Sequence, residues 1–372
     1  MKQAYIVIGT QFGDEGKGAT VNYLCSKVDK PLVVRFSGGH QVGHTVHYDG
    51  KRHVFSNFGA GTLRGVPTYW SEYCTVNPLG VMKESRVLGD MNVKPEIYFN
   101  PNALVTTPLD IIKNRTTQFN LEHGSVGVGF GTTIQRNEDN YRLYVRDLKY
   151  PKIRDAKINS IMKHYYIVDD NDKLQKLLQE FREACDFLVE NYKIIQYPES
   201  LLLSYDLIFE GSQGILLDME YGFYPNVTRS YTTSRNALEI LEKHNIRKSA
   251  VDTYYITRAY QTRHGNGFMT NEDMDLSYIK ENPFETNKTN AFQGHLRKGV
   301  VDVDLINYAL ECEYYHNTMP NKHLVITCLD QVPEKFPVMF NGELRELNYE
   351  QFAVTLGFAR NIYPTYSDKG IV

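Results

Sequence analysis

Short apolar runs alternate with amphipathic segments along much of the chain. The first run, residues 4–9, is rich in β-branched residues and is followed by a glycine-rich turn and an amphipathic segment at 19–28, so the chain opens as strand, loop and helix. Helical patterns also cover residues 173–192 and 303–315. Strands that alternate with helices predict an α/β fold with a mostly parallel central sheet and helices on both faces. The other strand candidates are residues 32–36, 205–209, 253–256 and 323–327.

Two long polar segments interrupt this alternation. Residues 119–147 and 271–298 are rich in Asn, Thr, Gly and Arg, but their sequences are too varied for a simple linker. We expect them to be long functional loops. The chain has no internal repeat and no break in composition, so one large domain over residues 1–372 is expected.

The composition is that of a globular protein without a polyanion-binding surface. Of the 372 residues, 42% are hydrophobic, and 41 basic and 44 acidic side chains give a net charge of -3, so nucleic acid is not an expected partner. The five cysteines are scattered, without the paired spacing of a zinc or redox site. No stretch approaches the roughly 18 apolar residues of a membrane span, and the start lacks a charged leader with a long apolar run, so a cytoplasmic protein is expected.

The first chemically informative segment is Gly9 to Gly18, with the sequence GTQFGDEGKG. Glycines where a strand turns into a helix let backbone N–H groups approach an anion, and Lys17 adds a positive charge, so the segment predicts a phosphate cradle. A common P-loop would need a hydroxyl where Gly18 stands. The alternative is an ordinary glycine-rich turn, in which Glu15 merely balances the charge of the helix start.

A second glycine-rich segment follows the second predicted strand. Residues 37–45 read SGGHQVGHT and bring two histidines and a hydroxyl to the same edge of the sheet. A lone histidine is more often structural, but one beside a phosphate-binding turn is suited to acid or electrostatic catalysis.

These motifs, with others further along, resemble the adenylosuccinate synthetase family. The matching blocks are GDEGKG, GGHQVGHT, FEGSQGILLD from residue 209, YGFYPNVT from 221, TRHGNG from 262 and TCLD from 327, all in family order. The resemblance implies a C–N ligase that uses a nucleoside triphosphate and Mg²⁺ to join L-aspartate to C6 of a 6-oxopurine nucleoside monophosphate through a 6-phosphoryl intermediate. It also implies a homodimer with shared active sites.

The resemblance implies a role for each matching catalytic residue. Asp14 would take the proton from purine N1 and contact Mg²⁺, and the Gly43 carbonyl would complete part of the metal shell. His44 would stabilise charge on the 6-oxygen and the transferring phosphoryl group. Lys17 would hold the triphosphate, and Gln213 would fix the 6-oxo nucleotide. The other residues that would bind the triphosphate are Gly13, Glu15, Gly16, Gly18, Thr45, Thr327 and Asp330.

Further residues would bind the monophosphate substrate. Ser125 and Thr228 would hold its 5′-phosphate, and Gln41 stands where the family usually has Asn. The family also uses an arginine from the neighbouring subunit, for which Arg136 and Arg142 are both candidates. Ser125 and Gln41 also have a structural interpretation as ordinary loop residues.

Two segments depart from the family pattern. An arginine-rich aspartate loop is replaced by TNAFQGHLRKG from residue 289, in which Arg297 alone is clearly in register; Thr289, Asn290 and Arg297 are the aspartate-binding candidates. The family sequence T-K-L-D, which recognises the base of GTP, has Cys328 in place of its lysine. The donor is therefore ATP or GTP, and the change makes ATP credible.

The acceptor nucleotide has two candidates. The chain is closer in size to the archaeal and phage branch, which includes phage enzymes that act on dGMP to make a precursor of diaminopurine DNA. Those enzymes typically lack the loop aspartate, so the presence of Asp14 favours IMP, whereas the rebuilt segments favour dGMP, which is our first hypothesis. A non-catalytic nucleotide-binding regulator is the alternative of another class, but it would not need Asp14, His44 and Gln213. A switch GTPase is excluded by the missing P-loop hydroxyl.

Overall fold

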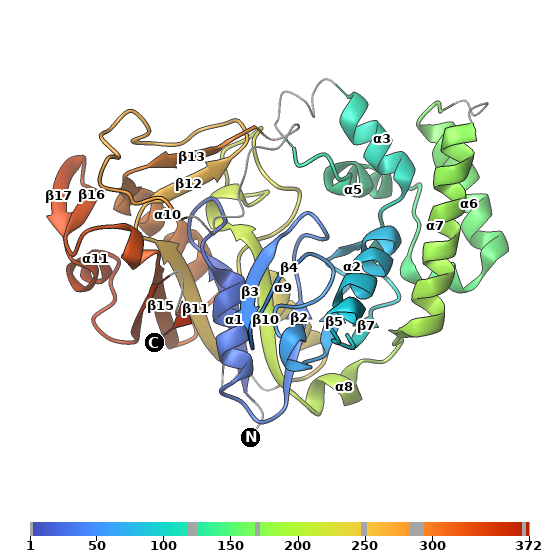
Figure 1. Ribbon diagram of the computed structural model, residues 1–372, viewed down its shortest axis with the longest axis horizontal. Helices are drawn as coiled ribbons and strands as arrows, with labels where there is room; N and C mark the ends of the chain where they lie inside the picture. The colour runs from blue at the N-terminus through green and yellow to red at the C-terminus, as the bar shows by residue number, and fades with distance from the viewer. Residues whose placement is uncertain are drawn as a thin grey trace.

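A ten-stranded sheet forms the centre of the molecule (Figure 1). The computed structural model describes residues 3–117, 125–167, 172–246, 251–282, 294–366 and 370–371. The strand order is β19-β18-β15-β11-β1-β10-β2-β5-β7-β9, and all neighbours are parallel except the edge pair β18 and β19. The strands are β1 (Ala4–Gly9), β2 (Pro31–Arg35), β5 (Thr68–Trp70), β7 (Ile97–Phe99), β9 (Lys193–Ile194), β10 (Asp206–Gly214), β11 (Val251–Arg258), β15 (Asn321–Thr327), β18 (Ile362–Tyr366) and β19 (Gly370–Ile371).

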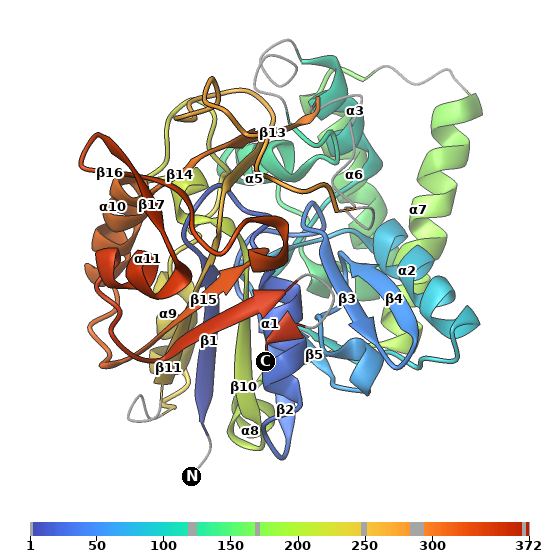
Figure 2. The same cartoon turned by 60° about the vertical axis from the view of Figure 1, so that its left-hand side comes forward.

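Helices cover both faces of the sheet, as predicted. Successive side chains of a strand point to opposite faces, so Val7 of β1 belongs to one hydrophobic core and Ile6 and Ile8 to the other. The two layers are visible on either side of the strands in Figure 2. The first core is covered by α1 (Lys17–Cys25), α2 (Pro78–Asp90), α6 (Pro151–His164) and α7 (Asp172–Asn191), and the second by α8 (Glu199–Leu203), α9 (Arg235–Lys243), α10 (Val303–Tyr314) and α11 (Tyr349–Thr355).

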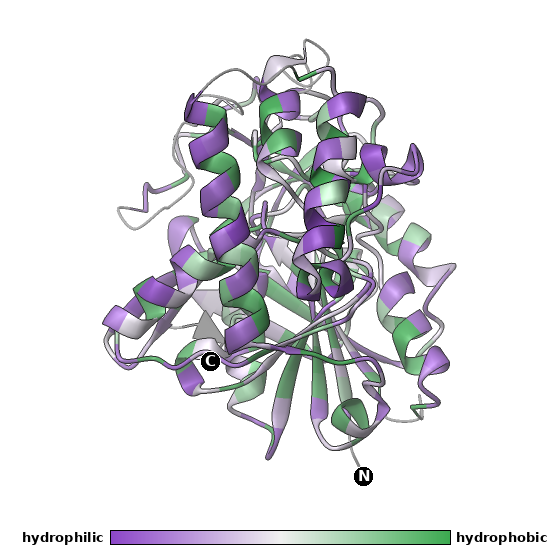
Figure 3. Ribbon diagram, turned by 90° about the vertical axis from the view of Figure 1, so that its right-hand side faces the viewer, coloured by the Kyte–Doolittle hydropathy of each residue, from purple (hydrophilic) through white to green (hydrophobic). Residues whose placement is uncertain are grey.

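Hydropathy explains how these helices lie. Figure 3 shows mostly apolar strands behind helices on which polar and apolar positions alternate. On α7 the buried residues Leu178, Phe181, Cys185 and Leu188 recur at intervals of three or four, so one stripe of the helix packs against the core. No helix in the described part of the chain is both long and apolar enough to cross a bilayer.

One predicted loop is partly helical. Residues 119–147 contain α5 (Phe130–Glu138), which packs against α3 (Pro108–Thr116) beside the sheet. The glycine at position 129, with φ 86°, begins α5 in a left-handed conformation that other residues rarely adopt. The prediction of a long loop was wrong here because the short amphipathic pattern of α5 lies within a polar stretch.

Short elements at the carboxyl ends of the strands complete the fold. Two hairpins carry candidate site residues: β3 (His44–Tyr48) pairs with β4 (Lys51–Phe55), and β12 (Gln261–His264) pairs with β13 (Leu296–Gly299). The remaining elements are β6 (Thr75–Val76), β8 (Leu104–Val105), β14 (Val301–Asp302), β16 (Phe336–Phe340), β17 (Glu343–Leu347) and the 3₁₀ turns η1 (Thr62–Arg64), η2 (Val145–Lys149), η3 (Ile215–Leu217) and η5 (Leu329–Gln331).

Candidate active site

The candidate site lies where β1, β10, β2 and β15 end. The glycine loop at 10–16 follows β1, the histidine loop at 36–43 follows β2, and Gln213 stands near the end of β10. The carboxyl ends of parallel strands share one edge of a sheet, and ligands of α/β proteins bind there. The fold therefore gathers the sequence motifs that were predicted to act together.

Left-handed backbone shapes the glycine loop. Gly13, Asp14 and Gly16 have φ values of 95°, 57° and 93°. Glycine adopts this conformation without strain, whereas an aspartate rarely does, so Asp14 is held in an unusual position with an exposed side chain. A left-handed non-glycine residue at a functional loop is typical of a side chain that the surrounding structure keeps in place for its chemistry.

The buried side chain of Glu15 stabilises this loop from its inner side. Its buried carboxylate accepts a hydrogen bond of 2.5 Å from the Gln11 backbone N–H and lies 3.5 Å from Lys17 Nζ. Burial raises the pKa of Glu15 to about 7, although the lysine opposes this shift. A β-carbon at Gly9 would lie 1.8 Å from the same carboxylate, so position 9 must be glycine. The side chain of Glu15 therefore has a structural role, because its contacts hold the glycine loop in place.

The missing P-loop hydroxyl has a steric reason. A β-carbon at Gly18 would lie 2.7 Å from the β-carbon of His44, closer than such atoms approach each other. The first turn of α1 thus abuts the histidine loop directly. Lys17, which is 2% exposed, lies in the same turn. The predicted triphosphate cradle and the predicted catalytic histidine are consequently neighbours.

His44 is held by a buried carboxylate. Its Nδ1 lies 2.5 Å from Glu210 Oε1, and the second oxygen of Glu210 accepts from the Ala60 N–H at 3.1 Å. Because Nδ1 faces a carboxylate, it carries the proton and donates, and Nε2 is left to face a ligand. Burial lowers the pKa of His44, against the pull of Glu210. Glu210 was not predicted as a site residue, although it is the glutamate of the block FEGSQG.

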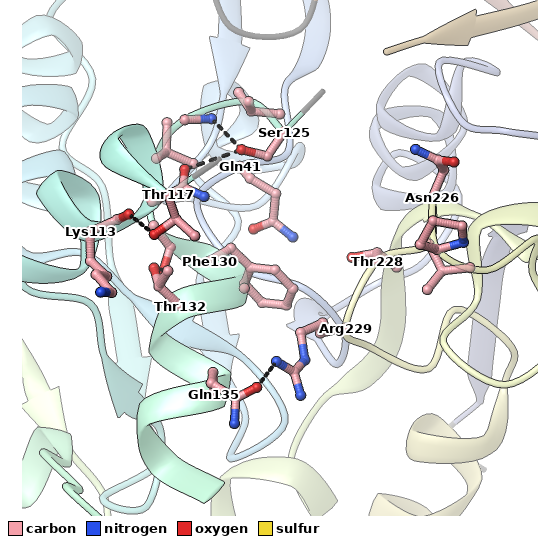
Figure 4. A pocket seen from close by; sticks show the side chains of 18 of the residues that line it. Gln41, Lys113, Thr117, Ser125, Phe130, Thr132, Gln135, Asn226, Thr228 and Arg229 are labelled. Atoms are coloured by element: carbon pink, nitrogen blue, oxygen red, sulfur yellow. Dashed lines mark hydrogen bonds between the residues drawn. The ribbon is translucent and has the colours of Figure 1, made fainter. Parts of the chain in front are cut away.

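A cavity of about 750 Å³ opens beside these loops. Figure 4 shows Phe130 and Thr132 of α5 on one side and Asn226 and Thr228 on the other, with open space between them. Arg229 bridges the two sides through Gln135 Oε1. The predicted residues Gln41, Ser125, Gln213 and Thr228 all line this cavity, which is large enough for a nucleotide.

Several buried polar atoms at the cavity have no protein partner. Among the described residues these include both amide atoms of Gln41, Gln213 Oε1 and His264 Nδ1; His44 Nε2, which is not part of the cavity lining, is unpaired as well. Buried polar groups in native proteins are nearly always hydrogen-bonded, so an unpaired cluster at a cavity is typical of a binding site. Ser125 differs, because its hydroxyl already donates to Asn114 Oδ1 at 3.2 Å.

Two cavity residues were missed by the sequence reasoning. Arg263 and His264 line the cavity at the end of β12. Arg263 donates to the Asn226 carbonyl at 2.9 Å, and burial lowers its pKa to about 10, which still leaves it charged at neutral pH. His264 Nε2 lies 3.4 Å from Asp14 Oδ2. Both belong to the block TRHGNG.

Arg136 does not have the position expected of an arginine donated to another subunit. Its side chain is fully buried, and Nε donates to Asp110 Oδ1 at 2.8 Å while Nη2 donates to the Val105 carbonyl at 2.8 Å. These contacts tie α5 to α3 within one chain, and the guanidinium cannot reach a neighbouring molecule. The other candidate, Arg142, is exposed and donates through Nε to the Asn137 carbonyl at 3.2 Å.

The segment Thr327 to Asp330, which corresponds to the family sequence that recognises the base of the triphosphate, lies against the glycine loop. Thr327 Oγ1 donates to the Glu15 carbonyl at 3.0 Å, and Asp330 is exposed in the turn that follows. Cys328, at the position of the family's lysine, has φ 62° and lies 3.3 Å from Arg258 Nε. An arginine from β11 therefore places positive charge beside the cysteine.

The aspartate candidates are only partly described. Thr289 and Asn290 lie outside the described residues. Arg297 forms a bidentate ion pair with Glu272 and donates to the carbonyls of Gly265 and Gly267 at 3.0 and 2.9 Å. Its guanidinium thus holds the loop that follows Arg263 and His264, which is a supporting position beside the cavity.

Mg²⁺ fits the exposed oxygen groups of the glycine and histidine loops. Mg²⁺ is usually held by one or two carboxylates together with substrate phosphates and water. The exposed Asp14 carboxylate and the exposed Gly43, next to Thr45 and His44 on β3, suit such a site. No group of three or more His, Cys, Asp or Glu side chains forms a metal cage within the described ranges.

The fold and the site together define an α/β protein with a nucleotide-sized cavity at the carboxyl ends of its central strands. The chain belongs to the adenylosuccinate synthetase family, which matches residues 6–367. The resemblance drawn from the motifs is therefore confirmed.

Individual relatives agree with this assignment. The chain is 29% identical to the adenylosuccinate synthetase of Chlorobium chlorochromatii over 73% of its own length and 65% of that protein, so the match spans about two thirds of the relative. It is 27% identical to the enzyme of Picrophilus torridus, over 93% of this chain and 82% of the relative.

Solved structures show the same fold. Fully ligated adenylosuccinate synthetase from Plasmodium falciparum superposes with a TM-score of 0.70 at 20% identity, over 93% of this chain and 83% of that one. The cyanophage S-2L succinoaminodeoxyadenylate synthetase PurZ, bound to dGMP and to dATP as energy donor, gives 0.62 at 16% identity, over 97% and 100%.

Proposed function

We propose that this protein is a nucleoside-triphosphate-dependent ligase that joins L-aspartate to C6 of a 6-oxopurine nucleoside monophosphate. The observation that carries this proposal is that Gln41 and Gln213, which carry unpaired buried amide atoms, both line one cavity of nucleotide size. The family of the chain supports the same reaction.

The reaction solves a leaving-group problem. The purine 6-oxygen leaves poorly, so it is first phosphorylated: Asp14 takes the N1 proton, and the 6-oxygen then attacks the γ-phosphorus with release of the nucleoside diphosphate. The aspartate amine next attacks C6, the C6–O bond breaks, and inorganic phosphate leaves with that oxygen. The amine loses its proton as the C–N bond forms.

Each residue has a defined part in these steps. His44, held by Glu210 through Nδ1, turns Nε2 to the 6-oxygen and the phosphoryl group. It stabilises the negative charge that develops there as the imidazolium, with Nε2 also protonated, and the Glu210 carboxylate favours that form. Lys17 neutralises the triphosphate, Gln213 holds the base, and Thr228 takes part in binding the 5′-phosphate. Asp14 and the Gly43 carbonyl would hold Mg²⁺, which would supply charge neutralisation at the phosphates.

The acceptor that we propose is dGMP. PurZ, which shares the fold, is bound to dGMP and dATP in its structure. The loss of the family's lysine at Cys328 favours an adenine triphosphate as donor. IMP is the second candidate, and the exposed, left-handed Asp14 of the glycine loop favours it. We also propose a homodimer in which Arg142, rather than the buried Arg136, reaches the phosphate of the neighbouring site.

Phosphate release tests the proposal. The purified protein is assayed with Mg²⁺, ATP or GTP, and each of IMP and dGMP, with and without aspartate. Release that requires both aspartate and a purine monophosphate supports the ligase, and the productive nucleotide identifies the acceptor. Hydrolysis that needs neither, or silence with every combination, contradicts it.

A further inference from the structure

Arg229 is a charged cavity residue to which the proposed reaction gives no part. It directly follows Thr228, and both residues line the cavity. A β-carbon at Gly131 would lie 3.8 Å from Arg229 Cδ, which is an ordinary contact distance, so the arginine stem packs against the first turn of α5. Figure 4 shows the side chain reaching from the wall of Thr228 toward Gln135 on the opposite wall. The guanidinium therefore crosses the cavity.

The present contacts of this guanidinium are weak enough for a ligand to replace them. It donates to Gln135 Oε1 and, at 2.7 Å, to Glu138 Oε2, both on α5. The side chains of Arg229 and Glu138 are 38% and 46% exposed, and water screens an ion pair at such a position. A phosphate group is a stronger partner, because its charged oxygens match the forked N–H donors of an arginine.

The other two cations of the described cavity lining are placed differently. Arg263 is 1% exposed and donates to the backbone carbonyls of Phe268 and, at 2.9 Å, Asn226, so its donors serve the fold. The Lys113 ammonium lies 5.9 Å from the centre of the Tyr165 ring, on the side of α3. Within the described lining, Arg229 is consequently the arginine whose bonds are exchangeable.

Resting on the proposed function, we infer that Arg229 binds the 5′-phosphate of the purine monophosphate, from the same chain and beside Thr228. The reaction brings two anions to the protein. The triphosphate is assigned to the glycine loop and Lys17, which is not part of the cavity lining, whereas the monophosphate is assigned to the cavity. The described lining has one acidic side chain, Asp139, against three cations, so a phosphate meets net positive charge there.

Glu138 then competes with the substrate. In this structure its carboxylate holds the guanidinium on α5, and a phosphate must displace it. Removal of that negative charge should therefore strengthen nucleotide binding. A purely structural ion pair predicts the opposite sign, because its loss would loosen the cavity wall and weaken the binding of every ligand.

The test compares each nucleotide with its nucleoside, dGMP with deoxyguanosine and IMP with inosine, by calorimetry without triphosphate or aspartate. Arg229→Gln should raise the Kd of the nucleotides by about 10-fold to 100-fold, the effect of a lost hydrogen bond to a charged group, and leave the nucleosides unchanged. Arg229→Lys should lose part of this affinity, because lysine keeps the charge without the fork. Glu138→Gln should lower the Kd of the nucleotides by up to about 5-fold.

Arg235→Gln is the matched control. Arg235 is also partly exposed and pairs with two glutamates, Glu220 and Glu239, both at 3.3 Å, but it does not line the cavity, so no Kd should change. Equal losses for nucleotide and nucleoside in Arg229→Gln, or no loss, overturn the inference. It is also overturned if the phosphate-specific loss appears in Lys113→Gln instead, or if Arg229→Gln weakens ATP or GTP rather than dGMP and IMP.

The outcomes separate this inference from the proposed function. Ligase turnover with an unchanged KM for the monophosphate in Arg229→Gln keeps the ligase and removes the role of Arg229. A preference for nucleotides over nucleosides that depends on Arg229, in a protein without ligase turnover, removes the ligase and keeps the role of Arg229.

Discussion

His44 Nδ1 lies 2.5 Å from the carboxylate of Glu210, and both side chains are buried. The pair joins two segments that are 166 residues apart. It orients the imidazole so that Nε2 faces a ligand, and it supplies negative charge to a ring that must stabilise a developing anion.

Glu210→Gln should therefore impair catalysis more than binding. The amide keeps the shape of the side chain but loses the charge that supports His44, and we expect kcat to fall by roughly 10²-fold or more. Steady-state kinetics check this. Glu84→Gln is the matched control, because Glu84 also pairs with a histidine, His53, at 3.2 Å but outside the site. A similar kcat loss in both variants would contradict the assigned role.

Gly18→Ser should not create a working P-loop. A β-carbon at position 18 would lie 2.7 Å from the His44 β-carbon, so the histidine loop must shift. We expect activity to fall by about 10²-fold, in line with the effect of small misplacements of catalytic groups. Gly89→Ala in α2 is the control, since its added β-carbon meets nothing within 4 Å. Wild-type kcat in Gly18→Ser would show that the close approach is unimportant.

Arg136→Met and Arg142→Met should have opposite consequences. Loss of Arg136 leaves Asp110 buried without its partner, and a cost of about 3–5 kcal/mol in unfolding free energy is expected. Loss of the exposed Arg142 should leave urea unfolding unchanged and raise KM for the purine monophosphate. Equal unfolding curves for the two variants would contradict the structural role of Arg136.

Glu313 predicts a pH dependence of stability. Burial raises its pKa to about 7 from 4.5, so the folded protein binds its proton more tightly than the unfolded chain does. The stabilisation is complete below about pH 4.5 and is lost as pH rises through 7, by an amount on the order of 3 kcal/mol. Glu313→Gln should retain a carbonyl for the Ser234 N–H and flatten this decline. Urea unfolding of both proteins at pH 5, 6, 7 and 8 gives the free energy of unfolding at each pH. The same decline with pH in Glu313→Gln as in the wild type would contradict the role of Glu313.

Much of the fold was predictable because buried parallel strands leave a strong pattern. The strand at 4–9 was placed with its observed bounds, and the helices at 173–192 and 303–315 within one residue. The strand predicted at 205–209 continues to Gly214, because EGSQG carries the polar site residues that weaken its apolar pattern.

The site was predictable only where a motif concentrated its residues. The glycine and histidine loops were found, whereas Glu210 and His264 were missed, because a single carboxylate or histidine becomes informative only after folding places it near Asp14 or His44. The burial of Arg136 was not predictable for the same reason. Sequence does not reveal that Asp110, 26 residues earlier, neutralises it in the core.

The fate of the purine 6-oxygen tests the ligase mechanism most directly. Acceptor nucleotide labelled with ¹⁸O at C6 is incubated with Mg²⁺, aspartate and triphosphate, and the released phosphate is analysed by mass spectrometry. Transfer through a 6-phosphoryl intermediate predicts that each phosphate released carries the label while aspartate becomes bonded to C6. Unlabelled phosphate, with the ¹⁸O retained in the nucleotide, would contradict the account.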